Sequence, residues 1–468
     1  MVYTLSEERI FELLTQIVGS ENISLSEADR VAYRYDIGPY LGKQPMCIIR
    51  PKSTDQVAEV LRVANRACLP VVPRSGGTHF AGQSLSWEGG IVLDLNGMNK
   101  VISIDPVAMV GVVETGVTWR QFDREAEKYG LQAGPIPQAG PMSCVGGAVS
   151  HNGMGHGSMR DLTSATQGDF VLGLEVVLPT GEIIKTGSWA ANCPPVERAG
   201  PGSDLTGLFI GACGTLGVIT QIVSKLRPRA KVIRYLQYGF EDIPSMVKGC
   251  AEALREHNVP SLFFMDYWAL KVFANKEFSP WNIMFTIEGA EEEEANYHEK
   301  CVRKALEEMG GKDWGADFVR LWIEYPTEAW LTLQRFGIWH GLGNIAVHPS
   351  QAKDFWDVWE KIVFEKHKWP RERSFGFGWV SRGGGCVGWW PITMYRDDDP
   401  EDKQKAIDIA FEVLPEWVKM GCNPYDGGGK TFNYKVYWQK LGPYYELMKR
   451  IKKMIDPNNI MNPGIIFP

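Results

Sequence analysis

A glycine-rich segment between two strand-like runs constrains this chain more than any other feature. Pro73-Arg-Ser-Gly-Gly-Thr-His-Phe-Ala-Gly82 follows the apolar residues 69–72 and precedes a second apolar run at 91–95. Gly76 and Gly77 can adopt positive φ and have no side chain, so consecutive backbone N–H groups can converge on a phosphate. The segment is neither Gly-x-Gly-x-x-Gly nor a Walker loop, and no helical pattern follows it, which excludes the Rossmann and P-loop arrangements. The sequence therefore predicts a strand, an anion-binding loop and a strand, with an ordinary glycine turn as the alternative.

Further glycine-rich motifs follow at wide intervals. They are Ser143-Cys-Val-Gly-Gly147, Ser150-His-Asn-Gly-Met-Gly-His-Gly157, Gly211-Ala-Cys-Gly-Thr-Leu-Gly217 and Ile455-Asp-Pro-Asn-Asn-Ile-Met-Asn-Pro-Gly464. In this order the motifs resemble the FAD domain of the vanillyl-alcohol oxidase and D-lactate dehydrogenase family, the PCMH-type FAD-linked oxidoreductases. The resemblance implies bound FAD and hydride transfer from a substrate C–H bond to flavin N5.

The resemblance also implies which residues contact FAD. They belong to the first loop, the second loop, the third motif and the C-terminal motif: Pro73, Arg74, Ser75, Gly76, Gly77, Thr78, His79, Gln83 and Ser84; Pro141, Cys144, Val145, Gly146, Gly147, Ser150, Gly153 and Gly155; Gly217, Val218 and Ile219; and Asn462. In relatives with covalent flavin, the attached histidine follows Arg-Ser-Gly-Gly directly, whereas Thr78 occupies that position here. Non-covalent FAD is therefore expected, and His79 or Cys144 would be the attachment site in the alternative case.

The composition changes after the third motif, which predicts a second domain. Thirteen of the 17 tryptophans lie within residues 228–425, and motif-like sequence returns only near the C-terminus. We predict an α+β protein with a PCMH-type FAD-binding domain at 1–227 and a cap domain at 228–425 that carries an antiparallel sheet. The segment 426–468 would return to the FAD domain. The length of 468 residues is sufficient for both domains.

Local patterns predict individual elements. Ser6 and the Ser53-Thr-Asp-Gln56 segment are typical of helix N-termini, and predict helices that end near residues 18 and 68. A further helix is expected from Thr118 to about residue 130. Strands are expected at 101–104, 110–114 and 173–178, and cap helices at 244–257 and 351–365.

The catalytic candidates lie in the flavin loop and near the C-terminus. His151 and His156 are candidate proton acceptors, ranked above Asp169. Phe432-Asn-Tyr434-Lys435 resembles the Tyr-Arg segment with which vanillyl-alcohol-type enzymes bind a phenolate, although lysine lacks the bidentate fork of arginine. Tyr434 would donate a hydrogen bond and Lys435 would supply a charge, or both would be ordinary surface and packing residues.

The aromatic residues of the cap are candidates for a substrate pocket. Trp389 and Trp390 follow a glycine-rich run that resembles the cap strand facing the flavin, and Trp339 and His340 form a second candidate pair. Core packing is the expected role of the other cap tryptophans. A pocket lined by aromatic faces would favour an aromatic or bulky apolar substrate.

Charge and cysteine usage restrict the partners. The formal charge of −7 is distributed without a basic stripe, which argues against nucleic acid or an anionic membrane and favours a small-molecule substrate. The N-terminus does not resemble a signal peptide and no apolar run is long enough to span a bilayer, so a cytoplasmic location is expected. The nine cysteines include no Cys-x-x-Cys, and the histidines of the cap show no ligand spacing, so neither a disulfide framework nor a metal site is expected. The resemblance implies a homodimer; the electron acceptor, oxygen or another molecule, stays open.

Three functional hypotheses follow. The first is FAD-dependent oxidation of an alcohol or a para-substituted phenol. The second is a D-2-hydroxy-acid dehydrogenase in which Arg335, Arg382 or Arg396 would bind the substrate carboxylate. The third is a flavin-binding protein without turnover.

Overall fold

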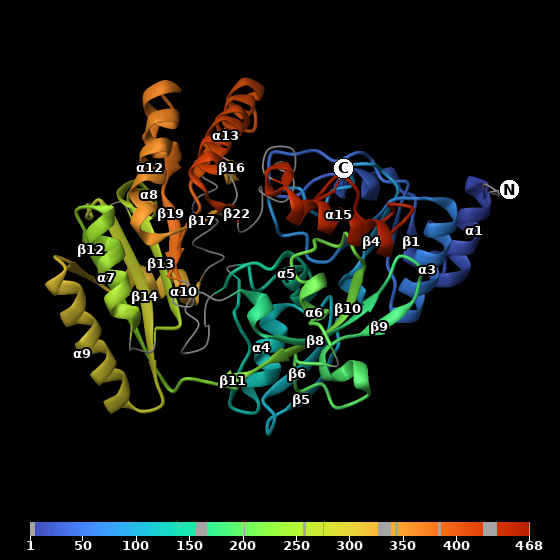
Figure 1. Cartoon of the computed structure of the whole chain (residues 1–468), viewed down its shortest axis with the longest axis horizontal. Coiled ribbons are helices and arrows are strands. Elements are labelled where there is room, and N and C mark those ends of the chain that lie inside the picture. Colours follow the sequence, from blue (N-terminus) through green and yellow to red (C-terminus); the bar gives the residue numbers. More distant parts are fainter. Residues whose placement is uncertain are drawn as a thin grey trace. The chain divides into compact units, whose positions relative to one another are not determined.

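The chain forms two compact units, which are described separately. The computed structural model describes residues 5–137, 139–155, 166–200, 202–255, 259–274, 276–325, 338–341, 345–381, 385–424 and 438–467. The first unit comprises Met1–Gly153, Gln167–Arg227 and Lys430–Pro468, and the second comprises Met154–Thr166 and Pro228–Gly429 (Figure 1). The first unit is thus built from segments that lie far apart in the sequence. Met154–Thr166, which the sequence-based boundary placed in the FAD domain, groups with the second unit.

The first unit begins with a small sheet covered by helices. Its strand order is β1-β2-β4-β3, and β2 and β3 both run parallel to β4. Helices α1 and α3 lie side by side against it (Figure 1), with Ser6 and Ser53 as their N-caps. The apolar faces of the two helices and of the strands share one core, because the helical and strand periodicities both direct these side chains inward. The bounds are α1 Glu7–Val18, β1 Ile23–Ser24, α2 Glu27–Ala32, β2 Cys47–Ile49, α3 Thr54–Ala67, β3 Val71–Arg74 and β4 Ile91–Asp94.

A second sheet completes the first unit. It has the order β5-β6-β10-β8-β9 and is antiparallel throughout. Helices α4, α5 and α15 contribute to its core together with the last residues of the chain. The bounds are β5 Val101–Asp105, β6 Val110–Glu114, α4 Trp119–Glu127, β7 Leu131–Gln132, α5 Val145–His151, β8 Val171–Val177, β9 Ile183–Lys185, α6 Thr206–Phe209, β10 Val218–Lys225, β11 Arg227–Pro228 and α15 Pro443–Ile455.

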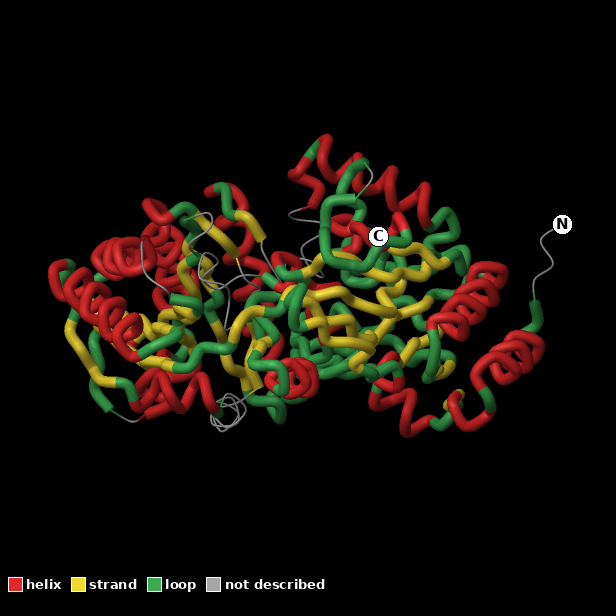
Figure 2. The backbone as a smooth tube through the Cα atoms, turned by 90° about the horizontal axis from the view of Figure 1, so that it is seen from below, coloured by secondary structure: helices red, strands yellow, loops and turns green. Residues whose placement is uncertain are grey.

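The second unit contains a large antiparallel sheet with the order β15-β12-β14-β13-β19-β20-β17-β22. Helices α7, α9, α12 and α13 share its apolar core. Figure 2 shows the backbone from below with helices in red and strands in yellow. A smaller sheet has the order β16-β21-β18. The bounds are β12 Val232–Phe240, α7 Ile243–Arg255, β13 Ser261–Asp266, α8 Tyr267–Ala274, β14 Trp281–Gly289, α9 Glu292–Glu308, β15 Lys312–Gly315, α10 Asp317–Glu324, β16 Ile338–Gly341, β17 Ile345–Val347, α12 Ala352–Trp359, β18 Ser374–Phe375, β19 Phe377–Val380, β20 Val387–Trp389, β21 Ile392–Tyr395, α13 Pro400–Met420 and β22 Asn423–Pro424.

The predicted α+β class is confirmed, and two local details differ from expectation. The second glycine motif, expected only as a loop, contains the short helix α5. The cap helix expected at 351–365 starts as α12 and continues as the π-helix Glu360–Lys366. Neither change is visible in residue patterns, because both depend on what packs against the segment.

Candidate flavin-binding site

Two glycine-rich loops of the first unit lie so close together that side chains would not fit at their contact points. Gly77, with φ +59°, lies in the turn after β3. A Cβ atom at Gly76 would lie 2.5 Å from the Met142 carbonyl oxygen of the second loop. A Cβ atom at Gly147 would lie 2.6 Å from Ser75 Oγ. Close contact between the two loops therefore requires glycine at positions 76 and 147, and the positive φ at Gly77 favours glycine there.

Helix α5 lies against the end of β6 through its first turn. The N–H groups of Val145 and Gly146 donate to the carbonyls of Val117 and Thr115, at 2.8 and 3.0 Å. A Cβ atom at Gly146 would be only 1.8 Å from Thr115 Oγ1. These two N–H groups are therefore engaged within the fold. Val145 and Gly146 shape the predicted cofactor site through packing and do not offer these donors to a phosphate.

Asn462 joins three of the predicted cofactor segments. Its Nδ2 donates to the Gln83 carbonyl at 2.9 Å and to the Cys213 carbonyl at 2.7 Å. Its own N–H donates to the Val71 carbonyl of β3 at 2.9 Å. Cys213 is in turn held by its N–H, which donates to the Ser150 carbonyl at 2.9 Å. A single buried side chain thus connects the first loop, the third motif and the C-terminal motif.

Buried oxygen atoms of this region fit a polar cofactor. Ser84 Oγ, Gln167 Oε1 and Asn462 Oδ1 are buried and have no hydrogen-bond partner among the residues described. Buried polar atoms are normally hydrogen-bonded, so an unsatisfied group signals a missing partner. Together with the close-packed glycines, these atoms meet the requirements of the FAD that the sequence predicts. Gln167 was not predicted, because it follows no glycine motif.

Two imidazole rings meet beside the first loop. The ring centroids of His79 and His151 are 4.2 Å apart, and His79 stacks on Phe80 at 4.4 Å. The Ala81 N–H donates to His79 Nδ1 at 3.2 Å, which leaves the proton of the neutral ring on Nε2. His151 closes α5 and is partly buried. The structure therefore brings together one predicted catalytic residue and one predicted cofactor residue.

Cys144, the N-cap residue of α5, is a thiol rather than a thiolate. Burial raises its pKa above the ordinary value for cysteine. Its Sγ lies 3.5 Å from Asn96 Oδ1, and Asn96 Nδ2 donates to the Ser75 carbonyl at 3.2 Å. Cys144 therefore supports the first loop. A neutral buried thiol is a poor nucleophile, which favours the expectation of non-covalent FAD over attachment at this residue.

Arg74, one of the predicted cofactor residues, binds an earlier segment of the chain. Its Nη1 and Nη2 donate to the carbonyls of Tyr33 and Tyr35 at 3.3 and 3.0 Å. Its guanidinium lies 5.1 Å from the centroid of the Tyr33 ring. The predicted cofactor residue therefore holds a neighbouring backbone segment. Neither Tyr33 nor the adjacent Asp36 was predicted, since no motif marks them.

The remaining predicted cofactor residues have mainly backbone roles. Gly217 requires close packing, because a Cβ atom there would lie 2.8 Å from the Val177 carbonyl oxygen. Val218 and Ile219 begin β10 and pair with β8. The residues that lie on the two loops or next to them are Pro73, Thr78, Pro141, Gly153 and Gly155.

The phenolate-binding prediction falls outside what the structure describes. Tyr434, Lys435 and His156 lie outside the described residues. Of Trp339 and His340, the structure describes the backbone, which pairs with β21.

Trp389 is a core residue, which corrects its assignment to a substrate pocket. Its side chain is 1% exposed, and its Nε1 donates to the Ala352 carbonyl at 3.1 Å. Its ring stacks on Trp356 at 5.2 Å and meets Phe264 edge-on at 4.9 Å. Trp390, which is partly exposed, packs edge-on against Phe377 at 5.4 Å. The alternation of side chains along β20 directs Trp389 into the helix-covered core.

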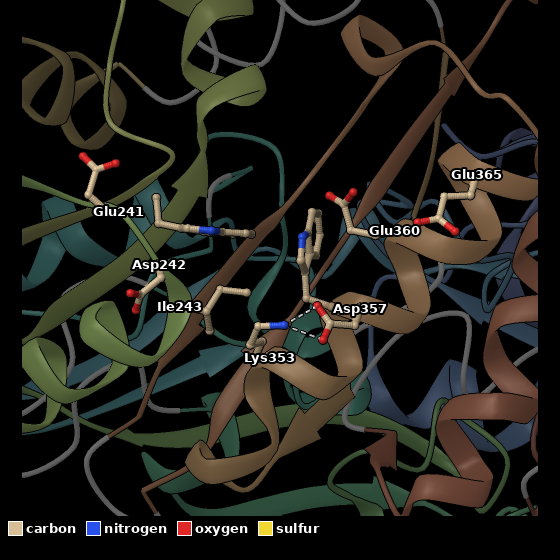
Figure 3. A pocket seen from close by; sticks show the side chains of 9 residues that line it. Glu241, Asp242, Ile243, Lys353, Asp357, Glu360 and Glu365 are labelled. Atoms are coloured by element: carbon tan, nitrogen blue, oxygen red, sulfur yellow. Dashed lines mark hydrogen bonds and ion pairs between the residues drawn. The ribbon is translucent and has the colours of Figure 1, made fainter.

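A hollow of about 440 Å³ lies in the second unit, and most of its charged lining residues are acidic (Figure 3). Lys353 Nζ contacts both carboxylate oxygens of Asp357, at 2.8 and 2.5 Å, as Figure 3 shows. Glu360 accepts from Arg371 at 2.7 Å. Asp242 accepts from the Ser245 N–H at 2.7 Å. The lining residues are Glu241, Asp242, Ile243, Trp281, Lys353, Trp356, Asp357, Glu360 and Glu365.

Within the described ranges, no group of three or more His, Cys, Asp or Glu side chains could hold a metal ion. In the same part of the chain, no helix combines the length and the apolar character needed to cross a membrane. Asp169, the weaker candidate base, is exposed.

Comparisons with known proteins support FAD as the cofactor of this chain. The family described as FAD binding domain matches residues 45–187, and the family described as FAD linked oxidases, C-terminal domain, matches residues 229–466. The chain is 34% identical over 471 residues to the glycolate oxidase subunit GlcD of Bacillus subtilis, covering 97% of this chain and 96% of that one. It is 35% identical to D-2-hydroxyglutarate–pyruvate transhydrogenase of Saccharomyces cerevisiae, covering 90% and 86%.

Solved structures share the whole fold at low identity. The p-cresol methylhydroxylase structure with substrate bound has a TM-score of 0.84 at 19% identity and covers 98% of this chain and 96% of its own. The 4-ethylphenol oxidase of Gulosibacter chungangensis has a TM-score of 0.83 at 17% identity and covers 100% and 99%. At these identities the likeness establishes the PCMH-type fold.

Proposed function

Because the chain belongs to the FAD-linked oxidase family, we propose that this FAD-dependent oxidoreductase oxidises a D-2-hydroxy acid. This is the second of the three hypotheses that follow from the sequence, and it replaces the first, an aromatic or bulky apolar alcohol or phenol. The observation that carries it is the 34% identity, over nearly the full length of both chains, to a glycolate oxidase subunit. D-lactate dehydrogenase of Arabidopsis thaliana and D-2-hydroxyglutarate–pyruvate transhydrogenase are also relatives whose names specify 2-hydroxy acids. The aromatic argument for a phenol is weaker, because Trp389 lies in the core.

The first unit would hold the cofactor through groups already in place. FAD, when bound, supplies the hydride acceptor at flavin N5. The loop containing Gly76 and Gly77 would bind its pyrophosphate through backbone N–H groups. The buried oxygens of Ser84, Gln167 and Asn462 would accept hydrogen bonds from its sugar, ribityl or flavin N–H and O–H groups.

His151 would act as the proton acceptor for the substrate hydroxyl. A general base is needed because the hydroxyl proton must leave as the C–H hydride is transferred. The ring centroid of His79 lies 4.2 Å from that of His151. Because the Ala81 N–H holds the His79 ring through Nδ1, the His79 ring would restrict the orientation of His151. His156 is the alternative base and lies outside the described residues.

The substrate carboxylate would need a cationic anchor. Arg396, one of the three predicted arginines, forms an ion pair with Asp399, so its charge is already compensated. Arg335 and Arg382 lie outside the described residues and are the remaining candidates. An arginine would bind the carboxylate through two parallel N–H···O bonds.

The test is anaerobic reduction of the purified holoenzyme. D-lactate, D-2-hydroxyglutarate and glycolate should bleach the flavin absorption at about 450 nm, whereas L-lactate should not. Admission of air to the reduced enzyme then tests oxygen as the acceptor, because an oxidase recovers its absorption rapidly. An enzyme that no 2-hydroxy acid reduces would contradict the proposed substrate.

A para-substituted phenol is the second candidate substrate. Two structural neighbours are named for p-cresol and 4-ethylphenol and match this chain over almost its whole length. Tyr434 and Lys435 would bind the phenolate oxygen in this case. Bleaching by 4-ethylphenol or p-cresol, without bleaching by 2-hydroxy acids, would select this alternative.

A further inference from the structure

A segment before β2 is fastened to the first flavin loop by reciprocal hydrogen bonds. We call residues 33–42 the strap. Arg74, from the loop, donates to the strap carbonyls of Tyr33 and Tyr35 at 3.3 and 3.0 Å. In the opposite direction, the strap residue Asp36 accepts through Oδ2 from the Gly82 N–H of the loop, at 2.7 Å. Each segment thus fixes the backbone of the other.

The contact between strap and loop is close as well as polar. Asp36 Oδ1 accepts from the Gly38 N–H at 2.8 Å, which closes a turn inside the strap. A Cβ atom at Gly38 would lie 1.8 Å from the carbonyl oxygen of Phe80. Phe80 stacks on His79, and Gly82 has φ +76°. The Asp36 carboxylate is therefore hydrogen-bonded to the turn that ends the first flavin loop.

The charge on Asp36 is maintained against desolvation. Burial raises its pKa to about 6, although the N–H groups of Gly38 and Gly82 and the guanidinium of Arg74 act in the opposite direction. Burial also lowers the pKa of Arg74, opposed by Asp36. A carboxylate with a raised pKa makes the folded state less stable at neutral pH. The two N–H groups and the guanidinium therefore offset only part of the cost of burying this charge.

Other charged groups surround this pair. Tyr33 donates through Oη to Asp94 Oδ2 at 2.5 Å, and Arg50 Nε lies 3.5 Å from the same oxygen. His79 belongs to the same loop as Gly82. These groups determine the local potential together with Arg74, so any effect of pH must be separated from theirs.

We propose that Asp36 is a positioning residue for FAD. By holding the Gly82 N–H, its carboxylate keeps the turn after Phe80 in place, and with it the preceding N–H groups that would bind the pyrophosphate. Asp36 contacts the first flavin loop and would affect FAD binding only through the position of that loop. This role concerns cofactor retention, so it does not depend on which substrate the enzyme oxidises.

The test is a titration of the apoprotein with FAD, in which flavin fluorescence reports binding and gives the Kd. Asp36→Asn should raise the Kd for FAD about tenfold or more at pH 8, because a charge-assisted hydrogen bond to the loop is lost. Asp105→Asn is the matched control. Asp105 also accepts two backbone N–H groups, from Val107 and Ala108 at 2.9 Å each, but in the turn between β5 and β6. The Kd of Asp105→Asn for FAD should differ from the wild-type Kd by less than about twofold.

The sign of the effect distinguishes positioning from simple charge. If Asp36 acted only through its negative charge, its removal would tighten binding of the anionic pyrophosphate. A Kd that is unchanged or lower in Asp36→Asn would therefore overturn the proposal. Circular dichroism and thermal unfolding of the variant apoprotein establish that it is folded.

The wild-type protein provides a second test that needs no variant. Its Kd for FAD should rise as the pH falls through about 6, where Asp36 becomes protonated. Protonation of His79 or His151 would add positive charge and strengthen pyrophosphate binding, which is the opposite sign. The rise should be absent in Asp36→Asn. A wild-type Kd whose dependence on pH from about 5 to 8 equals that of Asp36→Asn would overturn the proposal.

Discussion

The ammonium group of Lys452 lies 2.5 Å from the Asp456 carboxylate, and both side chains are buried. Lys452 Nζ also donates to the carbonyls of Thr215 and Met461, each at 2.9 Å. The carboxylate of Asp456 accepts from the Ile460 and Met461 N–H groups. One buried ion pair therefore connects α15, the third glycine motif and the C-terminal motif.

Removal of the lysine should leave an uncompensated buried carboxylate. Lys452→Met is expected to lower the free energy of unfolding by about 3–5 kcal/mol. Lys449→Met, on the same helix, breaks an exposed pair with Glu446 and should cost less than about 1 kcal/mol. Chemical denaturation followed by circular dichroism measures both. Equal effects of the two substitutions would contradict the buried-pair interpretation.

Asn462 should be important for FAD binding as well as for the packing of the segments that it connects. Asn462→Ala removes the donors to the Gln83 and Cys213 carbonyls and the buried Oδ1 acceptor, so the Kd for FAD should rise about tenfold or more. Asn458→Ala, the control in the same motif, removes only exposed hydrogen bonds to Asn65. Fluorescence titration of the apoproteins gives the two constants. An Asn462→Ala protein that retains wild-type affinity would rule out this contact.

His151 should affect chemistry rather than cofactor content. As general base it is expected to contribute about 100-fold or more to the rate, so His151→Asn should slow anaerobic flavin reduction by that factor. His367→Asn, which alters an ion pair with Glu412 in the second unit, serves as the control. Stopped-flow absorbance at saturating substrate measures the rate, and the flavin-to-protein ratio shows that both variants keep FAD. If His151→Asn reduces at the wild-type rate, His156 becomes the candidate base.

Stability should decrease as the pH rises from about 5 to 8. Asp266 accepts from the N–H groups of Ala269 and Gly376 at 2.8 and 2.7 Å, and burial raises its pKa to about 7. Its value in the unfolded chain is about 3.9. Between these values the native state binds more protons than the unfolded state, so the free energy of unfolding falls as the pH rises. Asp36 acts in the same direction with a pKa of about 6.

Carboxylates with lowered pKa do not obscure this slope. Asp402, which pairs with Arg373, is ionised in both states above about pH 5, so its stabilising effect is constant there. Thermal midpoints at pH 5, 6, 7 and 8 measure the trend, and Asp266→Asn should reduce it. A midpoint that rises steadily over this range would show that Asp266 is ionised at little cost.

The sequence predicted the cofactor site through its glycines. At Gly76, Gly146 and Gly147 any side chain would collide with a neighbouring loop or strand, so only glycine fits there. The helix caps Ser6 and Ser53 were predicted for a similarly local reason, since each side chain accepts a hydrogen bond from an N–H three residues later. Such requirements are visible in the sequence because they concern adjacent residues or a missing side chain.

Contacts between side chains and distant segments were not predicted. Arg74 was predicted only as a cofactor residue, and the structure adds that its guanidinium donates to carbonyls of a segment about 40 residues earlier. Trp389 was expected in a pocket, but three other aromatic rings surround it in the core. Asp36 was not predicted, because a single aspartate in a loop carries no motif.

The sequence by itself determined the family, the cofactor and the glycine positions of the two predicted flavin loops, because these depend on backbone conformation and close approach at particular glycines. Only the tertiary structure decided which side chains support those loops. Asp36, Asn462 and the Lys452–Asp456 pair act on segments far from them in the chain. Burial sets the protonation of Asp36 and Asp266, and burial arises only when distant segments pack together.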